Sequence, residues 1–175
     1  MMHTPHGHLP QQPASPAYST MQRTLKFIHI ATSAAFLGSL AAAAALAVAA
    51  ARDPAQLPAL RGAIAWVLWR VSVPAVLLLW VSGALAMLSR QAYMDARWVW
   101  VKLVAGSMAA AVVMVIAAPA ADLAADLARR AATGQPVGAA LAAALAREAL
   151  WTGVAAATGL AAMALGVWRP RLGGR

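Results

Sequence analysis

Long apolar runs bounded by charged residues are the feature that most constrains how this chain can fold. The first run covers residues 27–51, with Arg23 and Lys26 before it and Arg52 after it. A helix that crosses a bilayer needs about 20 apolar residues, whereas the apolar core of a signal peptide has only about 7–15. This run of 25 residues therefore predicts a membrane-spanning helix.

Three further apolar runs, at residues 71–89, 98–118 and 151–168, complete the pattern. Tryptophan favours the membrane interface, and six of the seven tryptophans lie near the ends of these runs. They are Trp66, Trp69, Trp98, Trp100, Trp151 and Trp168. Only 11% of residues are charged and 62% are hydrophobic, unlike a soluble domain with about 25% charged residues. We predict an all-α polytopic integral membrane protein, built as a four-transmembrane-helix up-and-down bundle.

The segments outside the runs define the domain organisation. Residues 1–22 are rich in His and Pro and predict a disordered tail, and residues 170–175 form a basic carboxyl-terminal tail. Residues 23–169 make up the transmembrane domain. Within it, residues 120–132 place leucines on one face and charges elsewhere, which predicts a helical extension between spans three and four.

The net charge of +9 would favour a nucleic-acid partner in a soluble chain. Here Lys and Arg lie mostly at the ends of apolar runs, where the positive-inside tendency and anionic headgroups explain them. We therefore expect membrane lipids as partners and no nucleic acid. We also expect the chain to form a homo-oligomer or to belong to a membrane redox complex.

The basic residues also predict the orientation in the membrane. The side that holds the chain termini has eight of them: Arg23, Lys26, Arg90, Arg97, Lys102, Arg169, Arg171 and Arg175. The opposite side has six: Arg52, Arg61, Arg70, Arg129, Arg130 and Arg147. Because positive residues favour the cytoplasmic side, we expect both termini in the cytoplasm of a bacterial-type inner (plasma) membrane.

Two ionisable side chains lie inside the predicted spans, where such groups are costly and usually face the bundle interior. His29 is the third residue of the first run, and Lys102 is the fifth residue of the third run. Spans one and three run parallel in an up-and-down bundle, so the two side chains are predicted at similar depth. Four further residues belong at this depth by helix geometry: Ser33, Gly106, Met87 and Met163.

This set of residues has metal-binding chemistry. Neutral imidazole binds haem iron, copper or zinc, and thioethers suit Cu(I) or the second axial position of a haem. A haem site would draw on His29, Lys102, Ser33, Gly106 and Met163, and a copper site on His29, Met87 and Met163. The spans hold a single histidine, so a bis-histidine haem within one chain is excluded.

Four short segments carry a resemblance to a known superfamily: residues 25–30 (LKFIHI), 70–72 (RVS), 81–83 (VSG) and 98–103 (WVWVKL). Over residues 22–168 the chain resembles the superfamily that joins the membrane domain of copper-resistance protein D, HemJ-type protoporphyrinogen oxidases and related four-helix membrane proteins. The resemblance implies that His29 is a haem ligand and that Lys102 matches a lysine of helix three. For the copper-resistance branch it implies copper uptake or handling.

These observations leave three functions open. The first is a b-type haem bound at His29, serving electron transfer or porphyrin oxidation, with Lys102 beside a propionate or acting on bound substrate as the catalytic group. The second is copper handling without catalysis. The third is a cofactor-free scaffold or assembly subunit of a membrane complex. Whether the protein is an enzyme stays open.

Overall fold

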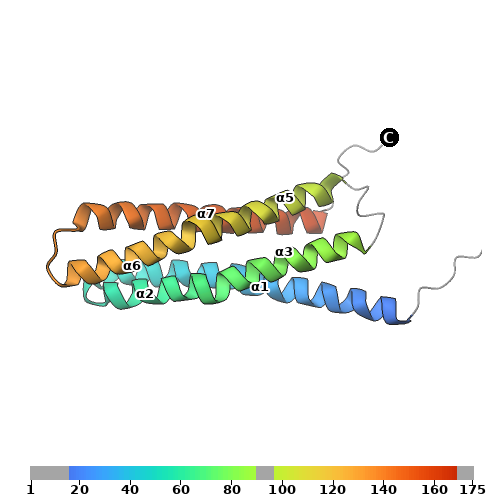
Figure 1. The fold of residues 1–175 in the computed structure, drawn as a ribbon, viewed down its shortest axis with the longest axis horizontal. Helices are drawn as coiled ribbons and strands as arrows, with labels where there is room; N and C mark the ends of the chain where they lie inside the picture. The colour runs from blue at the N-terminus through green and yellow to red at the C-terminus, as the bar shows by residue number, and fades with distance from the viewer. Residues whose placement is uncertain (1–15, 90–96, 169–175) are drawn as a thin grey trace, which may run out of the picture.

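The computed structural model describes residues 16–89 and 97–168, and every regular element in these two ranges is helical (Figure 1). The first and fourth helices are α1 (Pro16–Arg52) and α7 (Gly138–Trp168). The second consists of η1 (Pro54–Gln56), α2 (Leu57–Val67), η2 (Leu68–Ser72) and α3 (Val73–Leu88). The third consists of α5 (Arg97–Ala111), η3 (Val112–Ala117) and α6 (Ala118–Ala132).

Four stretches of the described chain are long and apolar enough to cross a membrane. They are Thr20–Arg52, Pro54–Leu88, Arg97–Ala132 and Gly138–Trp168. The predicted all-α bundle of four membrane-spanning helices is therefore confirmed, and the predicted extension after the third span is α6, which continues that helix.

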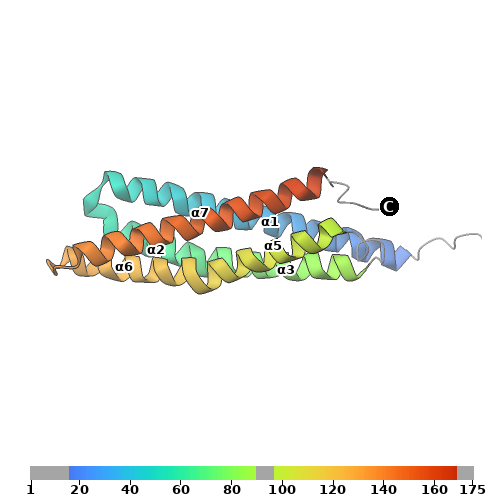
Figure 2. The ribbon, with the colours of Figure 1, turned by 90° about the horizontal axis from the view of Figure 1, so that it is seen from above.

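The four helices lie side by side in one elongated bundle, as both views show (Figures 1 and 2). Along it, α1 packs mainly on α3, α2 on α6, and α5 on α7. The start of α1 and the end of α7 lie at one end, which we call the terminal end. The opposite end, where α1 passes into η1 and α6 turns back into α7, is the loop end.

Local sequence signals explain the two turns at the loop end. Asp53 ends α1 and caps η1, because its Oδ1 accepts the backbone N–H of Ala55 at 3.0 Å. After α6, Gly134 adopts a left-handed φ of 79°, which glycine adopts without steric cost. Its N–H bonds the carbonyl of Ala131 and closes the last turn.

Two π-helical turns interrupt the second and third helices at corresponding places. In η2 the N–H of Val73 bonds the carbonyl of Leu68, and in η3 the N–H of Ala118 bonds that of Val113. A proline follows each turn within two residues, and proline has no N–H with which to continue the α-helical ladder. The chain therefore accommodates Pro74 with a π-turn, and it accommodates Pro119 in the same way.

The core lies where the four helices meet at mid-length. Its largest fully buried side chains include Phe36, Ile64, Leu68 and Val113. One polar contact crosses this apolar core, between the hydroxyl groups of Ser39 and Ser72 at 2.7 Å. Small residues elsewhere, mostly alanine, allow α6 and α7 to pack closely.

The helix α1 starts earlier than the sequence predicted. It begins at Pro16, so residues 16–22, which the sequence assigned to the disordered tail, continue the first helix. Proline is tolerated in the first turn of a helix, and no residue between it and the first span breaks the helix. The rest of that tail and the basic carboxyl-terminal tail lie outside the described residues.

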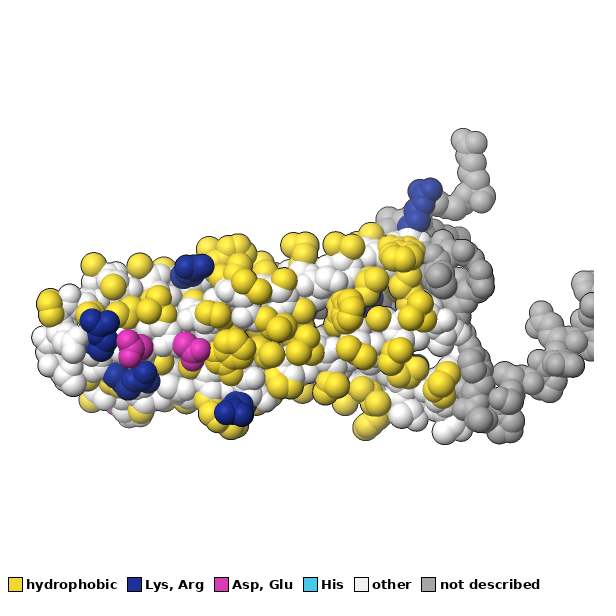
Figure 3. Space-filling view, viewed as in Figure 1, with side chains coloured by type: hydrophobic (Ala, Val, Ile, Leu, Met, Phe, Trp, Pro, Cys, Tyr) yellow, Lys and Arg dark blue, Asp and Glu magenta, His cyan; other side chains and the backbone are white. Residues whose placement is uncertain are grey.

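The bundle is longer than a membrane is thick. The stretch Pro54–Leu88 has 35 residues, which at about 1.5 Å per residue spans roughly 50 Å, against about 30 Å of hydrocarbon. Figure 3 shows Lys, Arg, Asp and Glu side chains over the loop end, and apolar side chains over the middle and the terminal half. From this distribution we infer that the hydrocarbon covers the terminal half and the middle, and that the loop end projects into the headgroup region and beyond.

Candidate functional site

A cavity of about 660 Å³ opens within the terminal half of the bundle, and all four spans contribute to its wall. Its lining is predominantly apolar, and pockets of this kind with a few polar groups are typical of ligand and cofactor sites. The apolar wall includes Phe36, Leu37, Val76, Leu79, Leu103 and Ala109. Few polar groups line the cavity, so each of them helps to identify the ligand that the cavity could bind.

His29 lies on the α1 side of this cavity and is anchored to α3. Its Nδ1 is 3.1 Å from the hydroxyl oxygen of Ser82, and that hydroxyl donates to the carbonyl of Leu79 at 3.0 Å. In the tautomer with the proton on Nδ1, the Ser82 oxygen accepts that proton and Nε2 keeps a free lone pair. This is the arrangement of metal-ligating histidines.

Glycine at position 83 makes room for this ring. A Cβ added to Gly83 would lie 3.2 Å from Cε1 of His29 and 3.6 Å from Nδ1. Any larger residue would push the imidazole away from α3. Ser82 and Gly83 thus fix the position of the ring together, one by a hydrogen bond and the other by close approach.

Lys102 brings an amine to the same cavity from α5. Its Nζ lies over α7, 2.9 Å from where a Cβ on Gly166 would be, so the amine fills the space that this glycine leaves. The lysine and His29 line the same cavity. Within the described chain, no carboxylate forms an ion pair with Lys102.

The other residues singled out from sequence also line this cavity. Met87 is buried, whereas Met163 is 44% exposed. The Ser33 hydroxyl donates to the carbonyl of His29 in its own helix at 2.7 Å, so it does not hold the imidazole. Gly106 faces Trp80, whose Cδ1 would lie 3.7 Å from an added Cβ. The described residues contain no cluster of three or more His, Asp or Glu side chains.

The lining residues that were not expected from sequence include Lys26, Trp80 and Trp98. Trp80 crosses from α3 to α5, where its Nε1 donates to the Ser107 hydroxyl at 2.8 Å. Its position in mid-span, away from the interface where the other tryptophans lie, was the available signal.

A second polar feature, also not expected, lies buried towards the loop end. An Nη of Arg61 in α2 donates to both carboxylate oxygens of Glu148 in α7, at 3.1 and 3.2 Å. Both side chains are less than a tenth exposed. From sequence, Arg61 was expected among the basic residues on the side opposite the termini. Its burial depends on the rotation of α2 about its own axis, which a count of charges does not define.

Comparison with known proteins gives one family. The sequence model of the family described as "Predicted integral membrane protein (DUF2269)" matches residues 23–170. No curated protein and no solved structure shows significant similarity to the chain. The matched range covers every residue of the cavity and all four spans except residues 20–22.

Proposed function

The chain belongs to the DUF2269 family of predicted integral membrane proteins, and on that premise we propose that its cavity binds a redox cofactor, b-type haem. One observation carries the proposal: His29, whose Nδ1 is held by the Ser82 hydroxyl, lines an apolar cavity of about 660 Å³. Cofactor pockets of about 300–1,000 Å³ with apolar walls are typical.

The other residues of the cavity suit an amphipathic ligand with acidic groups. Lys102 offers a cation without a carboxylate partner among the described residues, which a propionate of the porphyrin would neutralise. Met163, Ser33 and Gly106 complete the proposed haem-binding set, with Met163 as the available thioether. Bound haem would supply one-electron chemistry, either for electron transfer or for porphyrin oxidation with Lys102 as the group that acts on substrate.

The resemblance to HemJ-type oxidases and to the copper-resistance protein D membrane domain supports this proposal. It implied a histidine ligand in the first helix and a lysine in the third. His29 and Lys102 both lie at the wall of the same cavity, as a haem site that uses both side chains requires.

Copper handling is the second candidate, and one observation favours it. Met87, Met163 and His29 line the same cavity, and two thioethers with one imidazole form a soft ligand set for Cu(I). This candidate needs the two sulfur atoms to come within bonding distance of the same ion. The haem proposal needs only His29 as an axial ligand.

A visible absorption spectrum of the detergent-purified protein, with iron and copper analysis, tests both candidates. The haem proposal predicts a Soret band and stoichiometric iron, both lost in His29→Ala. A variant with His3, His6 and His8 all changed to Ala controls for binding by the histidine-rich tail and should keep the band. A colourless protein with stoichiometric copper would support the second candidate. A protein with neither iron nor copper after growth with haem precursors would contradict both candidates, and the scaffold or assembly function would remain.

Membrane placement follows the distribution of basic residues. We propose a bacterial-type inner (plasma) membrane with both chain termini in the cytoplasm, which puts the cavity in the cytoplasmic half of the bilayer. Membrane lipids surround the spans. A second copy of the chain or a membrane redox partner would exchange electrons with the cofactor.

A further inference from the structure

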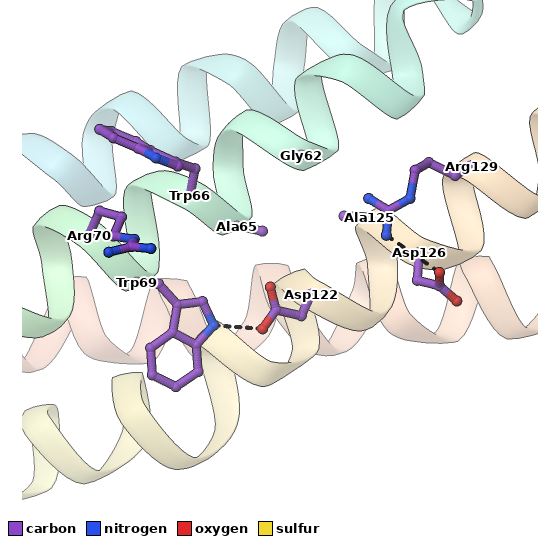
Figure 4. A pocket seen from close by; sticks show the side chains of 9 residues that line it. All are labelled: Gly62, Ala65, Trp66, Trp69, Arg70, Asp122, Ala125, Asp126 and Arg129. Atoms are coloured by element: carbon purple, nitrogen blue, oxygen red, sulfur yellow. Dashed lines mark hydrogen bonds and ion pairs between the residues drawn. The ribbon is translucent and has the colours of Figure 1, made fainter.

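A second hollow, of about 600 Å³, lies between α2 and α6 near the loop end and contains both signs of charge (Figure 4). Its floor is made of small residues, Gly62, Ala65 and Ala125, which keep it open. Its rim carries Trp66, Trp69, Arg70, Asp122, Asp126 and Arg129. It is separate from the cavity of His29, with which it shares no residue.

Two charged groups of this hollow remain available for a ligand. Asp126 is already paired with Arg129 at 3.4 Å and with Arg130 at 4.0 Å. Asp122 accepts the indole N–H of Trp69 at 2.6 Å but has no ion pair within the described chain. Arg70, next to Trp69 in η2, likewise has no ion pair there (Figure 4). The hollow thus offers one free cation and one free carboxylate, as far as the described residues show.

The depth of this hollow matches that of lipid headgroups. The apolar stretch of the second helix starts directly after Arg70, and that of the third helix ends shortly before Asp122. Trp66 and Trp69 have the interfacial position that tryptophan prefers. On the membrane side of the hollow, Leu78 and Val115 are more than half exposed, which offers apolar surface to acyl chains.

We propose that this hollow binds the headgroup of a zwitterionic phospholipid with a primary amine, the chemistry of phosphatidylethanolamine. Arg70 holds the phosphate by charge-assisted hydrogen bonds, and Asp122 accepts the ammonium group. The rim has two arginines and two aspartates, so a headgroup without net charge leaves no charge unbalanced. An anionic headgroup would satisfy Arg70 and leave Asp122 without a counter-ion.

Native mass spectrometry of the purified full-length protein tests this proposal. The protein would be incubated with equimolar phosphatidylethanolamine, phosphatidylglycerol and phosphatidylcholine in detergent. The expected result is preferential retention of phosphatidylethanolamine, weakened roughly tenfold by Arg70→Gln and by Asp122→Asn, since each removes one charge-assisted contact. Asparagine keeps an oxygen that accepts the Trp69 N–H, so the second variant preserves the hydrogen bond between η2 and α6.

Two further variants separate binding from folding. Gly62→Leu fills the hollow without removing a charge, and no atom lies within 4 Å of its added Cβ, so it should fold and lose the lipid. Arg147→Gln removes an exposed cation from the same half of the bundle but outside the hollow, so this variant should retain the lipid. Equal retention by wild type and all variants, preference for phosphatidylglycerol, or equal binding of phosphatidylcholine and phosphatidylethanolamine would overturn the proposal.

Discussion

At His29, the chemistry of the imidazole depends on which ring nitrogen holds the proton. The hydroxyl of Ser82 donates to Leu79, and its oxygen accepts from Nδ1 in the tautomer with the proton there. In that tautomer, which the proposed haem site requires, Nε2 is the ligand atom. The geometry of the proposed site therefore depends on a serine that contacts no cofactor, which makes Ser82 a positioning residue.

Replacing Ser82 tests whether its hydroxyl positions the His29 ring for haem binding. We expect Ser82→Ala to weaken haem affinity by about 10–100-fold, the usual effect of removing the second partner of a ligating histidine. Thr32→Ala is the matched control, because the Thr32 hydroxyl bonds only backbone carbonyls of its own helix and Thr32 does not line the cavity. Haem titration of both purified variants measures the difference. Equal affinity for the two variants would contradict the role of Ser82.

Two helical glycines make a second comparison. An added Cβ meets no atom within 4 Å at Gly38, so Gly38→Ala should stabilise the protein by about 0.5–1 kcal/mol through helix propensity. At Gly83 the same Cβ comes within 3.2 Å of the His29 ring, so this gain should be lost. Thermal unfolding midpoints in detergent give the comparison. An equal rise at both positions would show that the ring is not held against Gly83.

The sequence predicted part of this site and missed the rest for a physical reason. Depth along a span depends on residue count alone, so His29 and Lys102 could be assigned to one level. Contacts between helices depend on rotation about each axis, which hydrophobic periodicity does not define in a helix that is apolar all round. The contacts of His29 with Ser82 and Gly83 were therefore found only in the structure.

Among the elements, α2 and α7 are joined by the buried pair of Arg61 and Glu148. Removing one partner leaves an uncompensated buried charge, so we expect Glu148→Leu to destabilise the protein by about 3–5 kcal/mol. The double variant Arg61→Met with Glu148→Leu should recover most of this loss. Unfolding midpoints of the purified variants measure both effects.

An exposed pair serves as the control for this experiment. Arg129 and Asp126 are both about half exposed or more, so Arg129→Met should change stability by less than about 1 kcal/mol. If Glu148→Leu were as mild as Arg129→Met, the pair would not be buried in the membrane-embedded protein.

The elements also show what a sequence can predict. The apolar runs gave the number and order of the helices, and the leucines and charges of residues 120–132 gave the extension that became α6. The π-turns η2 and η3 were not predicted, although their prolines were visible, since a proline can be accommodated by a kink, a bulge or a break. Which of these forms depends on how the neighbouring helices pack.

For the whole molecule, the distribution of charge predicts the orientation. The chain has no cysteine, so a single introduced cysteine reports its own side of the membrane. We expect Gln135→Cys, in the exposed turn between α6 and α7, to react with a membrane-impermeant maleimide in intact cells. Gly174→Cys, close to the carboxyl end, should react only after the cells are opened. The reverse pattern would place both termini outside.

The central claim, that Nε2 of His29 is the axial ligand of a haem, is tested most directly by chemical rescue. The variant His29→Gly leaves a space where the imidazole was, next to the cavity of about 660 Å³. We predict that purified His29→Gly lacks the Soret band of the wild type and regains it when haem and free imidazole are added together. Haem with acetate or with no addition should fail. A Soret band that persists in His29→Gly, or that imidazole does not restore, would contradict the assignment.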